Sequence, residues 1–261
     1  MDIDESNEKL ELEILNAHKR DKNIVFDEAP HIYYINGSSD NISITTYIHT
    51  LFPNFDADLI IDKMQNGKNW LNSQYYGMTK EEIKNKWEKN KIEASTAGTK
   101  MHRDIELFYN NIPVNNESIE YSYFKNFLKD YPNLKAYRTE WIVYDKKYKF
   151  AGSIDMVFVN EKGEYLIYDW KRCKNITKTN AYENGHPPVD HLPHSNYWHY
   201  ALQLNMYKMI LEKNYNLKIV GLFLLCLHPD NSNLNYQRYE IPELKSEAKS
   251  LFRYRQEQLQ K

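Results

Sequence analysis

The chain is predicted to fold as an α/β domain in which a mixed β-sheet is flanked by helices. Three strand-like runs lie between residues 135 and 171, separated by the turn signals "DKK" and "NEKG", and they predict an antiparallel meander. An amphipathic helix over 196–215 and a continuous apolar strand over 219–228 follow, then a short strand over 235–241 and a closing helix from Pro242. Strands with helices on both sides in the sequence favour a mixed sheet.

The part of the chain before the meander is predicted to be mainly helical. Residues 5–20 carry apolar side chains among charges, which favours a short amphipathic helix, and "HIYYING" predicts a strand closed by a turn. The segment 43–64 opens with hydroxyl residues suited to helix capping, breaks at its proline and resumes as a helix. From residue 79 to about 110 the period is helical, and "STAGT" predicts a break with a second helix beginning near Ala97.

The composition indicates one globular domain with an N-terminal elaboration. The 261 residues are 41% hydrophobic and 14% aromatic, which is enough to bury a sizeable core. We expect a helical elaboration over residues 1–96 that roofs a cleft, and a core over 97–261 that includes a helix at 118–131. The net charge of -2 does not by itself indicate a nucleic-acid partner, although acidic surface elsewhere can offset a basic channel.

Cysteine usage and hydropathy indicate an intracellular protein. Cys173 and Cys226 are the only cysteines, too few for a disulfide framework or a four-cysteine zinc site. We therefore expect a reducing compartment, namely the cytoplasm, nucleus or mitochondrial matrix. No stretch reaches the ~18 apolar residues of a membrane span, and the acidic start differs from the basic head of a signal peptide. Neither membrane association nor secretion is expected.

Three charged residues lie in otherwise apolar strands. Side chains alternate faces along a strand, so Asp169 and Lys171 point the same way and Trp170 points the other way. Asp155 lies on the preceding strand, and a short turn can bring its carboxylate beside that of Asp169. Two carboxylates can hold one hard divalent cation, which removes the cost of burying these charges. With an adjacent lysine, the sequence has the groups needed for phosphodiester hydrolysis.

Asp155 followed by Asp169, Trp170 and Lys171 resembles the PD-(D/E)XK nuclease superfamily. Upstream, "AGTKMHRDIELF" is similar to the G-T-x-x-H-x-x-I-E signature of the RecB-like branch, and downstream "QLNMY" matches its Q-x-x-x-Y motif. Near the N-terminus "SITT" resembles a Ser-Val-Thr segment of several RecB-like exonucleases. The four main elements occur in order over residues 97–207. The resemblance implies a restriction-endonuclease-like core of the stand-alone exonuclease type found in phages, large DNA viruses or mitochondria.

The resemblance also implies a role for each matching residue. Four groups would be metal ligands: the His102 imidazole, the Asp155 and Asp169 carboxylates and the Trp170 backbone carbonyl. Lys171 would serve the attacking water, and Glu106 would bind a metal-bound water or orient neighbouring groups. Gln203 and Tyr207 would line the site and hold Lys171 or the nucleic-acid backbone. One or two Mg²⁺ or Mn²⁺ ions are implied, whereas relatives with an iron–sulfur cluster carry four cysteines, so no cluster is expected.

The implied partner is DNA, either single-stranded or with free ends, in replication, repair or recombination. Arg172, Lys174 and Lys178 directly follow the strand that carries Lys171 and would suit phosphate contacts, or form a solvated charge run. Two alternative functions stay open: a restriction-type endonuclease, and a nucleic-acid-binding module that keeps the fold without catalysis. Intact acidic residues and an intact lysine favour catalysis.

Structural interpretations compete with several of these assignments. A lone helical histidine such as His102 is more often a satisfied core or surface residue, Lys171 could be an edge-strand lysine, and Gln203 and Tyr207 could be ordinary amphipathic-helix residues. A zinc site built from Cys173 and later histidines is a further alternative. The histidines concerned are His186, His191, His194 and His199. Their spacing matches no standard zinc pattern.

Overall fold

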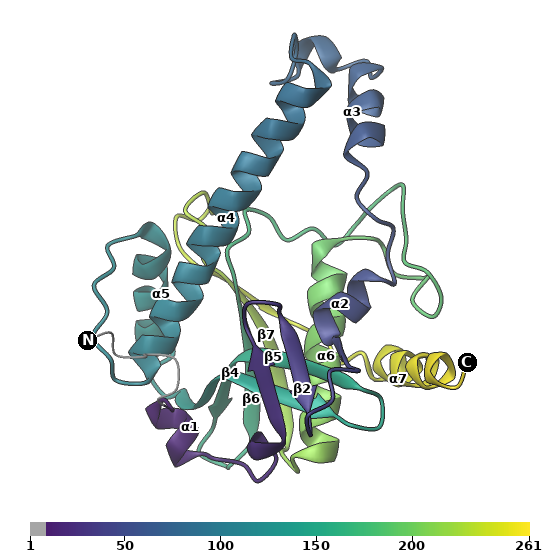
Figure 1. The fold of residues 1–261 in the computed structure, drawn as a ribbon. Coiled ribbons are helices and arrows are strands. Elements are labelled where there is room, and N and C mark those ends of the chain that lie inside the picture. The colour runs from purple at the N-terminus through teal and green to yellow at the C-terminus, as the bar shows by residue number, and fades with distance from the viewer. Residues whose placement is uncertain (1–8) are drawn as a thin grey trace, which may run out of the picture. The chain divides into compact units, whose positions relative to one another are not determined.

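The computed structural model describes residues 9–261 as an α/β protein with a mixed central sheet flanked by helices (Figure 1). Contacts group the chain into two compact units. One unit contains the described residues up to Pro53 together with Met101–Lys261, and the other is Asn54–Lys100. Helix α4 (Lys80–Tyr109) contributes residues to both units. The domain boundary after residue 96 and the cleft roof stay predictions.

The central sheet has six strands within the described residues. They are β3 (Ile42–Ser43), β4 (Lys135–Asp145), β5 (Phe150–Val159), β6 (Tyr165–Lys171), β7 (Ile219–Cys226) and β8 (Gln237–Glu240). β4, β5 and β6 form the antiparallel meander that the sequence predicts. β6 and β7 are parallel, and helix α6 (Asn196–Asn214) connects them, so the sheet is mixed as predicted.

Helices cover both faces of this sheet. On one face, α5 (Ile119–Asp130) and the last turns of α4 pack against β5, β6 and β7 through an aromatic cluster. The other face is covered by α2 (Ile44–His49), α6 and α7 (Lys245–Leu259). Most of the buried apolar side chains belong to these two layers. Burial of this kind is the main term that stabilises the fold.

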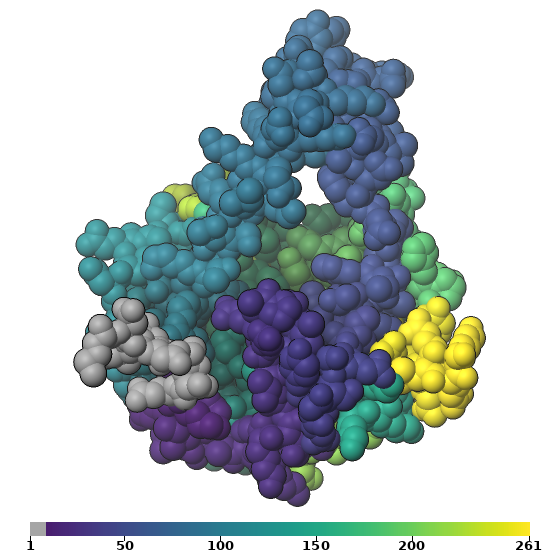
Figure 2. All heavy atoms as spheres, in the orientation of Figure 1, coloured from purple at the N-terminus to yellow at the C-terminus, as the bar shows by residue number. Residues whose placement is uncertain are grey.

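A separate hairpin packs on strands β4 and β5. It consists of β1 (Ile24–Asp27) and β2 (Ile32–Ile35), and the sequence predicts only the second strand. Tyr33 and Ile35 are buried against Tyr144 and Ala151. The hairpin lies at the front of the sheet in Figure 1, and its purple atoms form part of the surface that faces the viewer in Figure 2.

Helix starts follow the capping residues that the sequence offers. The Ser43 hydroxyl accepts a hydrogen bond from the Thr46 amide at 3.0 Å and begins α2. α2 ends before Pro53, as predicted, and Asp56 caps α3 (Ala57–Gln65) in the same way. α6 differs from its predicted amphipathic pattern, because residues 201–207 are all buried between the sheet and the helices α2 and α7. A helix that is apolar on most sides is typical of such a layer.

One helix prediction is wrong, and another is confirmed only in part. α4 is continuous from Lys80 to Tyr109, with no break near Ala97. One helical glycine costs only about 1 kcal/mol, and no proline interrupts the segment, so Gly98 does not end the helix. The helix predicted over 5–20 is only α1 (Glu11–Leu15) among the described residues; residues 5–8 lie outside them. It stops at Asn16, whose side-chain amide donates to the Tyr137 carbonyl of β4 at 2.9 Å.

The unit Asn54–Lys100 has a small core and ion pairs of its own. Ile61 of α3 and Ile83 of α4 are fully buried. Lys84 pairs with Asp58 at 2.7 Å, which joins the same two helices. None of the helices in the described part of the chain has an apolar stretch long enough to cross a bilayer.

His199 of α6 lies in a stack of aromatic rings. Its ring centroid is 4.0 Å from that of Phe52 and 5.2 Å from that of His194. Its buried Nε2 has no hydrogen-bond partner among the described residues. Burial, together with the neighbouring His194 and His49, lowers the pKa of His199 to about 4. The imidazole is therefore neutral in the folded protein at neutral pH.

The protein is expected to lose stability as the pH falls from about 6.5 to about 4. In that window an unfolded His199 binds a proton that the folded state does not bind, so the free energy of unfolding decreases, and this contribution levels off below about pH 4. Urea unfolding at several pH values measures the slope. His199→Phe should make this slope shallower. His191→Gln is the control and should not, because His191 is an exposed histidine that forms an ion pair. An unchanged slope in His199→Phe would contradict the assignment.

Candidate functional site

The site begins where β5 and β6 separate. On one edge of β5, β3 pairs with Phe150 and Ala151, and β6 pairs from Met156 onward. Residues 152–155 of β5 therefore have no strand partner on this edge among the described residues. β6 pairs with β7 along its whole length, but its pairing with β5 ends at Tyr168. The divergence leaves room for side chains between two strands that are neighbours elsewhere.

The backbone of Trp170 spans part of this divergence. Its N–H, which has no β5 carbonyl to bond, donates to Asp155 Oδ2 at 2.8 Å. Its carbonyl oxygen lies 3.0 Å from His102 Nε2. The prediction placed this carbonyl among the metal ligands, and the structure places it against the imidazole of a second predicted ligand. The Trp170 side chain points into the core, where it is 1% exposed, as the alternation predicts.

Glu140 of β4 lies directly across from Asp155. The β4–β5 ladder pairs the residues on either side of both, so the two face each other. Glu140 has φ 40°, in the left-handed region that residues other than glycine seldom adopt. Such backbone strain is often found at functional sites. The Ser153 hydroxyl donates to Glu140 Oε2 at 3.1 Å and fixes the carboxylate.

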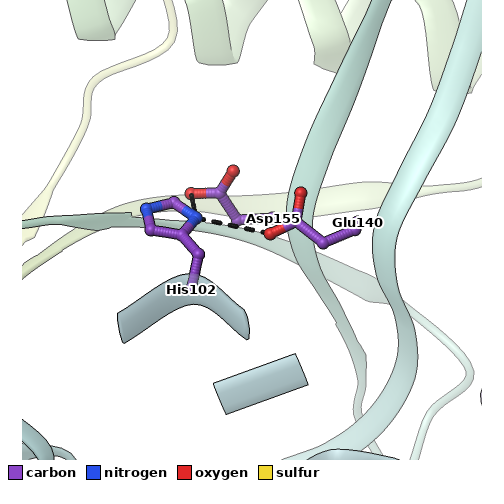
Figure 3. A group of neighbouring side chains, drawn as sticks. All are labelled: His102, Glu140 and Asp155. Carbon is purple, nitrogen blue, oxygen red and sulfur yellow. Dashed lines mark hydrogen bonds and ion pairs between the residues drawn. The ribbon is translucent and has the colours of Figure 1, made fainter. Parts of the chain in front are cut away.

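His102, Glu140 and Asp155 converge from three elements, α4, β4 and β5 (Figure 3). His102 Nδ1 is 3.3 Å from Glu140 Oε1 and 3.7 Å from Asp155 Oδ2. One ligand atom from each residue lies within 4.8 Å of the other two. Among residues 9–261, this is the group of three His, Cys, Asp or Glu side chains that lie close enough together to hold one ion. An imidazole with two carboxylates suits Mn²⁺ and related divalent cations.

The charges of this group depend on one another. Burial on its own would lower the pKa of His102, but Asp155 and Glu140 outweigh it and raise the pKa to about 9. Burial also raises the pKa of Asp155, although His102 and Lys171 act in the opposite direction. The imidazole thus carries a positive charge beside the two carboxylates. A divalent cation can supply that charge instead if it displaces the imidazole proton.

Asp169 and Lys171 lie on one face of β6, as the sequence predicts. Lys171 Nζ is 2.7 Å from Asp169 Oδ2, and their side chains are 20% and 4% exposed. Burial raises the pKa of Asp169 to about 6, despite the opposing effect of Lys171. Burial lowers the pKa of Lys171, but Asp169 and Asp155 outweigh this and raise it above its usual value. Lys171 is therefore a charged donor close to both aspartates.

The α6 motif residues lie inside the core. Tyr207 is 2% exposed, and a Cβ atom added to Gly152 of β5 would be 2.5 Å from its hydroxyl oxygen. Gln203 is also buried and hydrogen-bonds to Tyr207. Burial raises the pKa of Tyr207 well above its usual value, and Asp155 and Asp169 contribute. Tyr207 therefore packs against β5, and both residues offer a ligand little exposed surface.

Glu106 does not join the three-residue group. Its carboxylate pairs with Arg103, one turn earlier on α4, at 2.7 Å. Glu106 and Glu140 both line a cavity of about 120 Å³. The motif predicts the helical Glu106 beside the metal, whereas the structure brings the strand residue Glu140 to His102.

The predicted phosphate-binding residues have protein partners. Arg172 Nε lies 2.6 Å from Glu120 Oε1, and Lys174 Nζ lies 3.0 Å from Asp230 Oδ2. Lys178 is exposed, with its ammonium 4.6 Å from the centroid of a tyrosine ring of α6. Within residues 9–261, Lys178 is thus the member of this set that forms no ion pair with a carboxylate. A role in DNA contact stays a prediction for all three.

The alternative zinc ligands are not gathered into one group. His194 Nδ1 is 3.2 Å from a Glu183 carboxylate oxygen, and His191 Nε2 is 3.4 Å from one of Glu247. Cys173 contacts Cys226. No ligand set of three residues is found among these groups in the described part of the chain.

Two residues of the site, Glu140 and Tyr200, are not predicted from the sequence. Glu140 could have been found by counting back from the hairpin turn, because a register that pairs Asp145 with Phe150 sets Glu140 opposite Asp155. Tyr200 of α6 lies with its ring centroid 5.0 Å from Lys171 Nζ, and no motif marks it.

Glu140→Gln is expected to weaken Mn²⁺ binding by roughly tenfold or more, because it removes one charged ligand from the group. Glu106→Gln should have a much smaller effect, since Glu106 pairs with Arg103 instead. Titration calorimetry with MnCl₂ on both variants and the unmodified chain measures the difference. If Glu106→Gln weakened binding more than Glu140→Gln did, the helical glutamate would be the ligand.

Comparisons with known proteins identify no family. No family model and no curated protein matches the chain. Among solved structures, SSO0001 is 15% identical, with a TM-score of 0.34 over 86% of this chain and 78% of that one. A candidate exonuclease from Eubacterium rectale is 11% identical, with a TM-score of 0.29 over 59% of this chain and 70% of that one. These scores are too low to assign a function to the chain.

Proposed function

We propose that this chain is a metal-dependent nuclease of the PD-(D/E)XK type that hydrolyses DNA phosphodiester bonds. The observation that carries the proposal is the meeting of His102, Glu140 and Asp155 beside the Asp169–Lys171 ion pair, where β5 and β6 diverge. Motifs far apart in the sequence supply four of these residues, and Glu140 comes from β4. An ordinary buried ion pair would not require an imidazole, three carboxylates and an ammonium in one place.

The donor set fits a divalent cation. His102, Glu140 and Asp155 would hold it, because their ligand atoms already lie within 4.8 Å of one another. Asp169 is close enough to Asp155 for the two carboxylates to affect each other's charge, and it would add a further negative charge. When bound, the cation supplies positive charge against the negative charge that builds up on a phosphodiester during hydrolysis.

Lys171 would act as a charged hydrogen-bond donor. Its raised pKa keeps the ammonium protonated, so it can orient a water molecule or a phosphate oxygen but does not remove a proton. Asp169 fixes its position through the 2.7 Å ion pair. The Tyr200 ring, whose centroid is 5.0 Å from Nζ, would further stabilise the ammonium through a cation–π contact.

The proposal is tested by offering three substrates with MnCl₂ or MgCl₂. These are end-labelled single-stranded DNA, end-labelled linear duplex and covalently closed circular duplex, at equal nucleotide concentration. We expect the first two to be degraded from their ends and the closed circle to survive. Rapid cutting of the closed circle would instead indicate an endonuclease, and binding of all three without hydrolysis would indicate a non-catalytic module.

A further inference from the structure

The two cysteines of the chain meet next to the proposed site. Cys173 Sγ lies 3.4 Å from Cys226 Sγ, although 53 residues separate them in the sequence. Cys226 is the last residue of β7 and is 1% exposed, whereas Cys173 lies just beyond β6 and is partly exposed. Both thiols are free. A reactive pair requires one accessible thiol and a second thiol within reach, and this pair has both.

The pair is linked to Lys171 through the backbone. Lys171 is the β6 residue that pairs with Cys226 in the parallel ladder, and Cys173 is two residues further along. Cys226 is also paired with Gln237 of β8, so β7 is fixed on both sides. A disulfide bond is about 2.05 Å long, so the sulfurs must approach by roughly 1.3 Å. Cys173 itself lies beyond the end of β6 and has no partner in the ladder, so we expect the approach to come from its side, two residues from Lys171.

We infer that Cys173 and Cys226 are a thiol–disulfide modification site whose oxidation restrains the proposed nuclease site. The oxidant is a low-molecular-weight disulfide such as oxidised glutathione. The Cys173 thiolate attacks one glutathione sulfur, the glutathione S–S bond breaks, and one glutathione leaves. The Cys226 sulfur then attacks Cys173 and releases the second glutathione. Two protein thiols are oxidised, one glutathione disulfide is reduced, and the two thiol protons end on two glutathione molecules.

Oxidation is expected to slow hydrolysis about tenfold or more, because small displacements of a positioning group have effects of this size. This consequence rests on the proposed function. Formation of the disulfide does not, because it depends only on the two sulfur atoms and their access to the oxidant.

The test uses the full chain incubated with oxidised glutathione or with dithiothreitol, then labelled with N-ethylmaleimide in denaturant and weighed by mass spectrometry. The oxidised chain should take no label and carry no glutathione, and the reduced chain should take a label on each cysteine. Cys173→Ser and Cys226→Ala cannot form the bond and serve as controls. The hydrolysis rate of single-stranded DNA, measured on the same samples, should fall on oxidation, recover with dithiothreitol and stay constant in Cys173→Ser.

Two labels after oxidation, or a stable glutathione adduct on Cys173 beside a free Cys226, would overturn the modification site. A complete disulfide with an unchanged rate would overturn the restraint on Lys171. If the reduced chain hydrolysed no DNA, the proposed function would fail, and the label count would still decide whether the disulfide forms.

Discussion

Asp155→Asn is expected to lower the rate of phosphodiester hydrolysis by about 10²-fold or more and to weaken Mn²⁺ binding. Asp155 is the residue on which the site converges: its carboxylate faces His102 Nδ1 at 3.7 Å and accepts the Trp170 N–H at 2.8 Å. Asparagine keeps the shape and can still accept that hydrogen bond through its amide oxygen. The loss should therefore reflect the missing charge and not a collapsed strand.

Initial rates on end-labelled single-stranded DNA measure the effect, and thermal unfolding checks that the variant is folded. Glu161→Gln is a suitable control, because Glu161 is an exposed carboxylate in the turn between β5 and β6. It should hydrolyse DNA at the rate of the unmodified chain. Full activity of folded Asp155→Asn would remove Asp155 from the reaction.

Lys171→Met is expected to lower hydrolysis by about 10²-fold or more while the chain still binds Mn²⁺. In the proposed reaction the lysine donates to the reacting groups and is not a metal ligand, so metal binding and hydrolysis should separate. The substitution also leaves Asp169, whose side chain is 4% exposed, without its counter-ion. Breaking a buried ion pair from one side costs roughly 3–5 kcal/mol, so a loss of stability is expected as well.

The double variant Asp169→Asn/Lys171→Met distinguishes the two effects. It removes both charges, so it should recover much of the stability lost in Lys171→Met but none of the hydrolysis. Lys218→Met is the surface control, because Lys218 forms an ion pair at 2.6 Å but is 73% exposed. Recovery of hydrolysis together with stability in the double variant would show that Lys171 has only a structural role.

The parts of the fold that the sequence predicts well are those with a strong local signal. The β4–β5–β6 meander follows from alternating apolar residues and two turns, and β7 from one continuous apolar run. The continuity of α4 through Gly98 could not be predicted in this way, because one glycine without a proline is only a weak signal for a break. The hairpin strand β1 depends on packing against Tyr144 and Ala151, which no local pattern reveals.

The same distinction applies to the site. A charge in an apolar strand, or motif spacing, identifies four residues that the structure brings close together: His102, Asp155, Asp169 and Lys171. Glu140 depends on strand register and on an unusual backbone conformation, and both are tertiary properties. For the other motif residues, spacing alone does not show which partner a side chain finds. Glu106 pairs with Arg103, and Tyr207 packs on Gly152.

The central claim, that this group of residues holds a divalent cation and hydrolyses DNA with it, is tested most directly by one titration. The hydrolysis rate of end-labelled single-stranded DNA is measured as MnCl₂ is added to the metal-free chain, and EDTA is added in excess at the end. We expect a rate that rises from zero, saturates with the Mn²⁺ affinity found by calorimetry, and returns to zero with EDTA. Hydrolysis that proceeds unchanged in excess EDTA would contradict the account.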